Sequence, residues 1–400
     1  MTRVKSNLKY QLLGKGSGKL FALLFYVFLA RFLGEEAYGE FTYALVICFI
    51  FGQPLVLMGQ DLLVAKWVSR GKTGILRSSF RVWALSSLTA AAVIIILSLF
   101  IRVNRPVLYL LLGYLVFMIF EEILYSYRRG QENMKLEGIF FPLQRVVVVL
   151  LVFVFAWTGF KDPAGGALAL LLPAVIGAVF LSCIMRKDIS GSLSDPDKSI
   201  DARSLFKEGI SLSAVTFLWM IYFRVDSFML GALADMKAVG VYNGAYRLIE
   251  GVFFLPGVIL MVYFPGLAKK TDFRKKFLKV FFLLTGLGIV FAGGVLVLSP
   301  LIIKILYSGE FTGSAPVLRL LSIALFFVFI GHLTTQSLVA LDMNRTYLIL
   351  TGAGALINVV LNYFMIPVYG PEGAAMVTVI TEFFVTLFTG GMAWLKSASL

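Results

Sequence analysis

Long apolar stretches recur along almost the whole of this chain of 400 residues. A helix that crosses a bilayer needs about 20 consecutive apolar residues, and the sequence holds twelve stretches near that length. Several of them contain arginine or carboxylate side chains, which are costly in lipid and usually face a protein interior or a polar pathway. The chain is therefore predicted to be an all-α polytopic membrane protein.

The predicted spans are similar in length and are separated by mostly short polar loops. They cover residues 12–33, 37–59, 79–101, 106–127, 138–158, 164–185, 209–233, 238–264, 277–298, 316–338, 345–366 and 372–395. The composition is 59% hydrophobic and only 14% charged, which is unlike that of a soluble domain. The first span is longer than a signal peptide and lacks a small-residue cleavage site, so we expect it to remain a membrane helix.

The net charge of +14 is distributed according to the predicted topology. Basic residues gather before the first span and after the even-numbered spans, as in the run from Lys269 to Lys279. The alternate loops hold few basic residues, which is the positive-inside asymmetry. We therefore expect a protein of the cytoplasmic (inner) membrane with both termini in the cytoplasm. The same cations would contact anionic lipid headgroups, and nucleic acid is not an expected partner.

The two halves of the chain carry a similar hairpin near their beginnings. In each half a glycine at the turn precedes a proline in the middle of the following span. The spacing from Gly39 to Pro54 differs by one residue from the spacing between Gly240 and Pro256. A proline inside a helix removes one backbone hydrogen bond and can bend the helix. Pro54 and Pro256 are thus matched candidates for hinges.

A polar segment over residues 188–208 separates the first six spans from the last six. It would be a cytoplasmic linker between an N-terminal lobe, 1–187, and a C-terminal lobe, 209–400. Because each lobe has an even number of spans, both enter the membrane in the same sense and are related by an axis along the membrane normal. Two pseudo-symmetric six-helix lobes of this kind typically enclose a central cavity, and rocking them gives alternating access.

Two segments resemble a known family. The run Ala30-Arg-Phe-Leu-Gly-Glu-Glu-Ala-Tyr-Gly-Glu-Phe41 resembles the first outer hairpin of polysaccharide-repeat-unit (O-antigen) flippases, which are Wzx-like members of the multidrug/oligosaccharidyl-lipid/polysaccharide (MOP) exporter superfamily. The run Asn358-Val-Val-Leu-Asn-Tyr-Phe-Met-Ile-Pro-Val-Tyr-Gly-Pro-Glu-Gly-Ala-Ala375 is similar to that family's penultimate hairpin. The resemblance implies export of a polyprenyl-diphosphate-linked saccharide and no enzymatic activity. It also implies polysaccharide polymerase or glycosyltransferase machinery as partners.

Arginines inside the spans are the candidate substrate contacts. A guanidinium group stays protonated and makes paired hydrogen bonds to phosphate, so it suits a diphosphate headgroup. The candidates are Arg224, Arg247, Arg145, Arg31 and Arg319. An alternative is that some of them form internal salt bridges. Arg224 and Arg247 lie at depths similar to those of Asp226 and Glu250, and Arg145 at a depth similar to that of Glu121 and Glu122.

Carboxylates inside the spans are candidates for ion coupling or for salt bridges. A buried carboxylate whose access changes during a transport cycle can bind H⁺ or Na⁺ in one state and release it in the other. The candidates are Asp226, Glu250, Glu121, Glu382 and Asp61. We expect no other cofactor and no metal site.

Two other functions compete with a flippase. A cation-coupled multidrug exporter of the same superfamily would have a similar fold, but cationic drugs favour a cavity dominated by carboxylates. The first span here holds no acidic residue, and several arginines lie deeper in the chain. A membrane-embedded polymerase or ligase would need outward loops that carry catalytic groups, and the sequence shows no nucleophile–base or metal constellation in its short outer loops.

Overall fold

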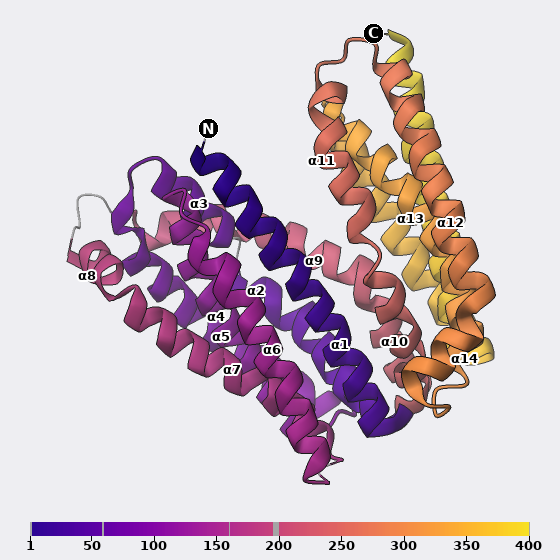
Figure 1. Cartoon of the computed structure of the whole chain (residues 1–400), viewed down its shortest axis with the longest axis horizontal. Coiled ribbons are helices and arrows are strands. Elements are labelled where there is room, and N and C mark those ends of the chain that lie inside the picture. Colours follow the sequence, from indigo (N-terminus) through magenta and orange to yellow (C-terminus); the bar gives the residue numbers. More distant parts are fainter. Residues whose placement is uncertain (1, 58–59, 160, 195–199, 400) are drawn as a thin grey trace. The chain divides into compact units, whose positions relative to one another are not determined.

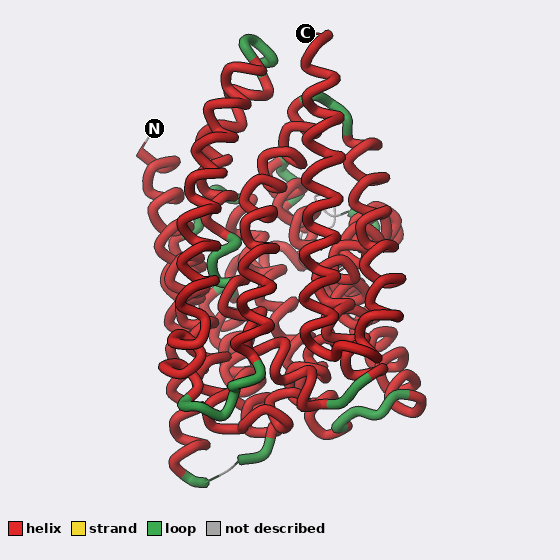
Figure 2. The backbone as a smooth tube through the Cα atoms, turned by 90° about the vertical axis from the view of Figure 1, so that its right-hand side faces the viewer, coloured by secondary structure: helices red, strands yellow, loops and turns green. Residues whose placement is uncertain are grey.

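The structure is a computed structural model that describes residues 2–57, 60–159, 161–194 and 200–399. The described residues form helices joined by short loops, and no strand appears among them (Figures 1 and 2). Ten helical segments in this part of the chain are long and apolar enough to cross a membrane. The all-α membrane class predicted from the sequence is confirmed.

The helices of the first half cover the predicted spans and add two short helices that the sequence did not predict, one after the second span and one after the sixth. They are α1 (Thr2–Ile47), α2 (Gln53–Leu57), α3 (Gln60–Ser69), α4 (Leu76–Phe100), α5 (Arg105–Gly130), α6 (Lys135–Trp157), α7 (Pro163–Ile184) and α8 (Arg186–Ser194). Local sequence sets two of the starts. Asn104 and Asp162 each accept a hydrogen bond from a backbone N–H of the first turn of α5 and α7, and a proline lies within the next two residues of each.

The second half continues in the same way. Its helices are α9 (Ala202–Leu233), α10 (Met236–Glu250), α11 (Phe254–Ala268), α12 (Phe273–Tyr307), α13 (Ser314–Ala340) and α14 (Asn344–Lys396). Helix α13 packs against both α12 and α14, and its buried residues include Leu325, Phe329 and Leu333. Asp235 caps α10, because its carboxylate accepts a hydrogen bond of 2.7 Å from the backbone N–H of Ala238.

Two of the helical runs are too long to be single spans. α1 contains Gly34 at φ 76°, and α14 contains Gly370 at φ 55°, so each run consists of two helices joined at a glycine in the left-handed region. The ten runs therefore cover the regions of all twelve predicted spans. Each long run thus covers two predicted spans, and a single glycine with non-helical backbone angles separates the two helices.

The described residues divide into two compact units. One comprises residues 1–33 and 40–221, and the other comprises residues 34–39 and 222–400. The division thus falls within α9 rather than over 188–208, the segment expected to be a linker. The first residues of that expected linker, 188–194, are helical and belong to α8, and residues 195–199 lie outside the described part of the chain. Tertiary contacts explain this helix, because Asp188 pairs with Arg128 at 2.7 Å and the hydroxyl of Ser192 accepts a hydrogen bond from the backbone of Leu76.

Both predicted hinge prolines lie where a helix changes its geometry. A π-helix over Cys48–Gly52 directly precedes α2, which holds Pro54 in its first turn. A turn at residues 251–253 separates α10 from α11, and Pro256 lies in the first turn of α11. Neither proline therefore removes a hydrogen bond from the middle of a regular helix. Their role as hinges stays a prediction.

Candidate functional site

Three of the predicted site residues form one ionic cluster in the second unit. The carboxylate of Glu250 accepts a hydrogen bond of 2.6 Å from Arg224 and one of 2.7 Å from Arg247. Arg247 and Glu250 face each other because they lie three residues apart on α10. Arg224 reaches the same carboxylate from α9. The salt-bridge alternative is correct for these two arginines, and within this trio two cations share one anion.

Aromatic side chains border this ionic trio. The guanidinium of Arg224 lies 5.9 Å from the centre of the Tyr246 ring, within the range of a cation–π contact. The Tyr246 ring in turn stacks on that of Tyr242, with ring centres 5.7 Å apart. Tyr242 links the trio to a second polar cluster, because its hydroxyl belongs to that cluster.

The second cluster surrounds Asp226, which is almost completely buried. One carboxylate oxygen accepts a hydrogen bond of 2.8 Å from the Tyr242 hydroxyl and lies 3.1 Å from that of Thr378. The other accepts one of 2.6 Å from the amide nitrogen of Asn362, which also donates to Asn358. Among the described residues, Asp226 therefore does not pair with an arginine at salt-bridge distance. Its carboxylate on α9 instead accepts hydrogen bonds from hydroxyl and amide groups on α10 and α14.

Glu382 on α14 has a single described partner in the same unit. Its carboxylate accepts a hydrogen bond of 2.9 Å from the hydroxyl of Tyr222, at the beginning of the second unit on α9. Both side chains are partly or largely buried. Glu382 thus belongs to the polar face of α14 that also holds Thr378, one helical turn earlier on the same face.

Arg145 in the first unit differs from the two arginines on α9 and α10. Its guanidinium lies 3.4 Å from the Tyr114 hydroxyl and 5.0 Å from the centre of the Phe141 ring. Within the described residues no carboxylate lies within 4.0 Å of it, and its buried Nε makes no hydrogen bond. The structure therefore places a guanidinium group without a salt bridge inside a membrane helix, α6.

Among the described residues, the alternative pairing of Arg145 with Glu121 or Glu122 does not form at salt-bridge distance, although Glu121 is near enough to attract the guanidinium electrostatically. Glu121 instead accepts a hydrogen bond of 2.8 Å from Gln144, whose amide also donates to the carbonyl of Pro173. Glu122 pairs at 2.6 Å with Arg129. The reason is geometric, because Gln144 takes the position beside Glu121 and α6 directs the adjacent Arg145 toward Tyr114.

The remaining predicted residues lie apart from these clusters. Arg31, near the end of the first predicted span, and Arg319, in the second turn of α13, are both exposed. In the described structure neither has a carboxylate within 4.0 Å. Asp61 belongs to α3, but its side chain lies outside the described residues.

Sequence analysis missed most residues of the Asp226 cluster. Asn358 and Asn362 are fully or almost fully buried in α14. A signal was present, because two asparagines four residues apart on one face of an apolar span must satisfy their amides inside the protein. Thr378 gave no such signal, since threonine in a membrane helix usually bonds to the backbone of its own helix, as it also does here.

The fold is similar to those of two solved membrane proteins. The chain superimposes on an inward-facing multidrug resistance MATE family transporter with a TM-score of 0.73 and 16% identity, over 96% of this chain and 95% of that one. It matches the lipid II flippase MurJ in an inward closed conformation with a TM-score of 0.71 and 18% identity, over 96% and 86%. At these identities the likeness is one of fold alone.

The chain belongs to the polysaccharide biosynthesis protein family, whose pattern matches residues 4–271. A probable flippase, AglR of Haloferax volcanii, is 25% identical over 273 residues. That match covers 63% of this chain and 54% of the relative, so the chain matches about half the length of this curated protein. The family assignment drawn from the resemblance is confirmed, and the first of the two hairpins lies within the matched residues.

Proposed function

We propose that the protein moves a polyprenyl-diphosphate-linked oligosaccharide, a polysaccharide repeat unit, across the cytoplasmic membrane by alternating access. Membership of the polysaccharide biosynthesis family and the fold shared with a lipid II flippase support this assignment. The observation that carries it is Arg145, a cation inside an apolar helix with no described carboxylate at salt-bridge distance. Such a cation is costly in the membrane unless an anionic ligand compensates it.

Arg145 is suited to the phosphates of the substrate. Its planar guanidinium can form two parallel charge-assisted hydrogen bonds to a phosphate. Tyr114 and Phe141 hold the group by its edge and its face, so that its orientation is set before the ligand arrives. Because the side chain is already ordered, less conformational entropy is lost when the phosphate binds.

Arg224 and Arg247 serve as a second anion contact in this proposal. Because they share the single carboxylate of Glu250, the trio carries a net positive charge. A phosphate could replace Glu250 as the partner of one guanidinium without leaving the other unpaired. The trio would then bind the diphosphate in one state of the transport cycle and close on Glu250 in another.

The Asp226 cluster supports coupling to Na⁺ or H⁺. Hard cations prefer oxygen ligands, and this cluster offers the carboxylate of Asp226 and the hydroxyl oxygens of Tyr242 and Thr378, from three helices. The Oδ1 atom of Asn362 is buried and has no hydrogen-bond partner among the described residues. A buried acceptor of this kind fits a cation ligand, because it would otherwise lose its hydration without compensation.

A cation-coupled multidrug exporter is the second candidate. The fold likeness to the MATE family transporter and the buried carboxylate of Asp226 favour it. The two functions differ in the charge of the substrate, since a drug cation would be repelled by Arg145 whereas a diphosphate would be attracted.

Reconstitution into liposomes tests the proposal. We expect labelled lipid-linked saccharide to reach the far leaflet, and a cationic dye to remain where it was added. Replacing Arg145 with Ala should abolish flipping, and Arg145→Lys should restore part of it because the charge returns without the planar fork. Arg345→Ala, which removes an exposed arginine at the beginning of α14, is the matched control and should flip normally. Transport of the dye alone would contradict the proposal.

A further inference from the structure

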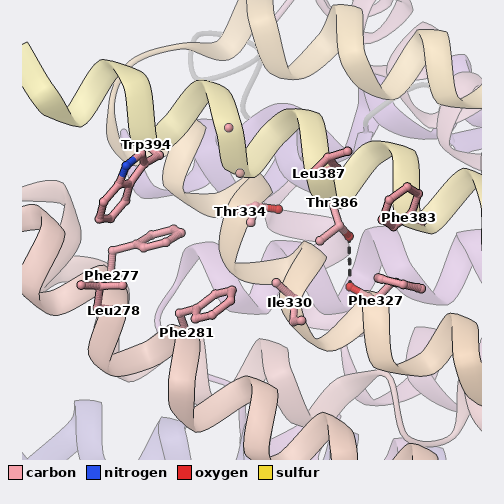
Figure 3. Close-up of a pocket in the computed structure, with 12 residues that line it drawn as sticks. Phe277, Leu278, Phe281, Phe327, Ile330, Thr334, Phe383, Thr386, Leu387 and Trp394 are labelled. Atoms are coloured by element: carbon pink, nitrogen blue, oxygen red, sulfur yellow. Dashed lines mark hydrogen bonds between the residues drawn. The ribbon is translucent and has the colours of Figure 1, made fainter.

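An apolar cavity of about 490 Å³ lies in the second unit, between α12, α13 and the last part of α14. Its volume is in the range of sites that bind small ligands. The wall is largely aromatic, with Phe277 and Phe281 from α12, Phe327 from α13, and Phe383 and Trp394 from α14 (Figure 3). No residue of the ionic trio or of the Asp226 cluster lines it.

The few polar side chains in the wall do not offer hydrogen bonds to a ligand. The hydroxyl of Thr386 donates to the backbone carbonyl of Phe327 at 3.1 Å, the bond drawn in Figure 3. The hydroxyl of Thr334 bonds to Thr389 at 2.7 Å. A sugar or phosphate placed here would lose its hydration without compensation. The cavity therefore selects a hydrocarbon chain.

One end of this cavity carries positive charge. Trp394 lies at that end, and the guanidinium of Arg274 stacks over its ring at 4.7 Å. Arg274, Lys275 and Lys279 lie in the first two turns of α12, and among the described residues none of them has a carboxylate within 4.0 Å. Basic residues at this end of α12 are those that the positive-inside asymmetry places in the cytoplasm. An amphiphile with an anionic head and an apolar tail matches this arrangement.

We propose that this cavity binds the first isoprene units of the polyprenyl carrier, with the adjoining phosphate held at Arg274 on the cytoplasmic side. This inference rests on the proposed function, because it takes its lipid from that substrate. Phe383 lies eleven residues before Trp394 on α14, so the cavity extends about 16 Å along the helix at 1.5 Å per residue. A polyprenyl tail is longer than that, and its remainder would stay in the bilayer.

The shape of the wall favours a branched isoprenoid over a straight acyl chain. Gly391 in the wall leaves open space, because a Cβ there would meet no heavy atom within 4 Å. Methyl branches can occupy such a gap. Membrane lipid tails are as apolar as the wall, so apolar contact area alone cannot distinguish one hydrocarbon chain from another. The shape of the cavity and the positive charge of Arg274 at its end must make this distinction.

A photoreactive polyprenyl phosphate without a glycan tests the site separately from transport. The probe carries a diazirine in its second isoprene unit and is added to the full-length protein in liposomes of neutral phospholipid. We expect labelling of peptides from α12 and the end of α14. Gly391→Phe should fill the cavity and lower this labelling by about tenfold. Gly294→Phe, at an open position of α12 outside the cavity, is the control and should label normally.

Two further measurements test phosphate binding at Arg274 and distinguish the proposed lipid site from the proposed transport function. Arg274→Gln should weaken labelling by polyprenyl phosphate but not by the corresponding uncharged alcohol. Arg345→Ala, which removes an exposed arginine outside the cavity wall, should label as the unchanged protein does. Failure of saccharide transport with normal labelling would contradict the proposed function alone. Labelling elsewhere in the chain, normal labelling of Gly391→Phe, or equal displacement by a straight-chain anionic phospholipid would overturn the carrier site.

Discussion

Gly39 and Gly240, the matched turn glycines of the two halves, lie against each other in the second unit. A Cβ on Gly39 would overlap the carbonyl oxygen of Met236 and lie 3.0 Å from the backbone nitrogen of Gly240. A Cβ on Gly240 would likewise overlap the carbonyl oxygen of Glu35. The two backbones can approach this closely only because neither residue has a side chain. The matched glycines therefore have a structural reason, because both allow this close approach.

Replacing either of these glycines with alanine should destabilise the protein. The added methyl group meets backbone, which cannot move aside as a side chain could, so the loss should be at the upper end of the about 1–3 kcal/mol typical of overpacking. Thermal unfolding in detergent measures it. Gly294→Ala, which adds a methyl group to open space on α12, should unfold at the original temperature or above. Equal stability of Gly39→Ala and this control would contradict the close approach.

Gly177 should be equally intolerant of a side chain, for a different reason. A Cβ there would overlap the Oε1 atom of Glu121 and lie 2.7 Å from the Nε2 atom of Gln144. We expect Gly177→Ala to break the hydrogen bond between these side chains and to lower stability by about 1–3 kcal/mol. Gly191→Ala, on the exposed face of α8, should instead gain up to about 1 kcal/mol because alanine favours helix. Thermal unfolding of both variants in the same detergent decides the point.

The sequence predicted the helices well and the side-chain contacts only in part. Helix positions followed from the length of apolar stretches, which the bilayer dictates. The pair of Arg247 and Glu250 was visible because residues three apart on a helix are neighbours whatever the fold. The partner of Arg145 was not visible, since Glu121, Glu122 and Tyr114 lie within about two helical turns of one another on α5, and only the packing of α6 decides among them.

The ionic trio should behave as one unit in stability measurements. Glu250→Gln leaves the guanidinium groups of Arg224 and Arg247 close together without their anion. We expect a loss of about 2 kcal/mol, below the range for fully buried pairs because the Glu250 side chain is 33% exposed. Adding Arg247→Gln to this variant should lose less than the sum of the two single changes, because the second change removes a charge that had become unpaired. Additive losses in thermal unfolding would show that the three groups act independently.

Alanine variants of the two arginines separate stability from transport. Arg224→Ala and Arg247→Ala should each remain in the membrane, and each should abolish flipping of labelled lipid-linked saccharide, since one cation of the phosphate contact is gone. Arg345→Ala again serves as the control. An unchanged flipping rate in both variants would remove these arginines from the mechanism and leave Arg145 as the phosphate contact.

Asp226→Asn should uncouple transport from the ion gradient while largely preserving the fold. The amide keeps the shape of the carboxylate, but it removes the negative charge that would hold Na⁺ or H⁺ among Asn362, Thr378 and Tyr242. In liposomes the rate of saccharide flipping by the variant should no longer respond to a Na⁺ or proton gradient. Asp342→Asn removes a carboxylate whose side chain is 81% exposed and should respond as the original protein does. A gradient response that survives Asp226→Asn would show that the coupling ion binds elsewhere, and Glu382 would be the next residue to replace.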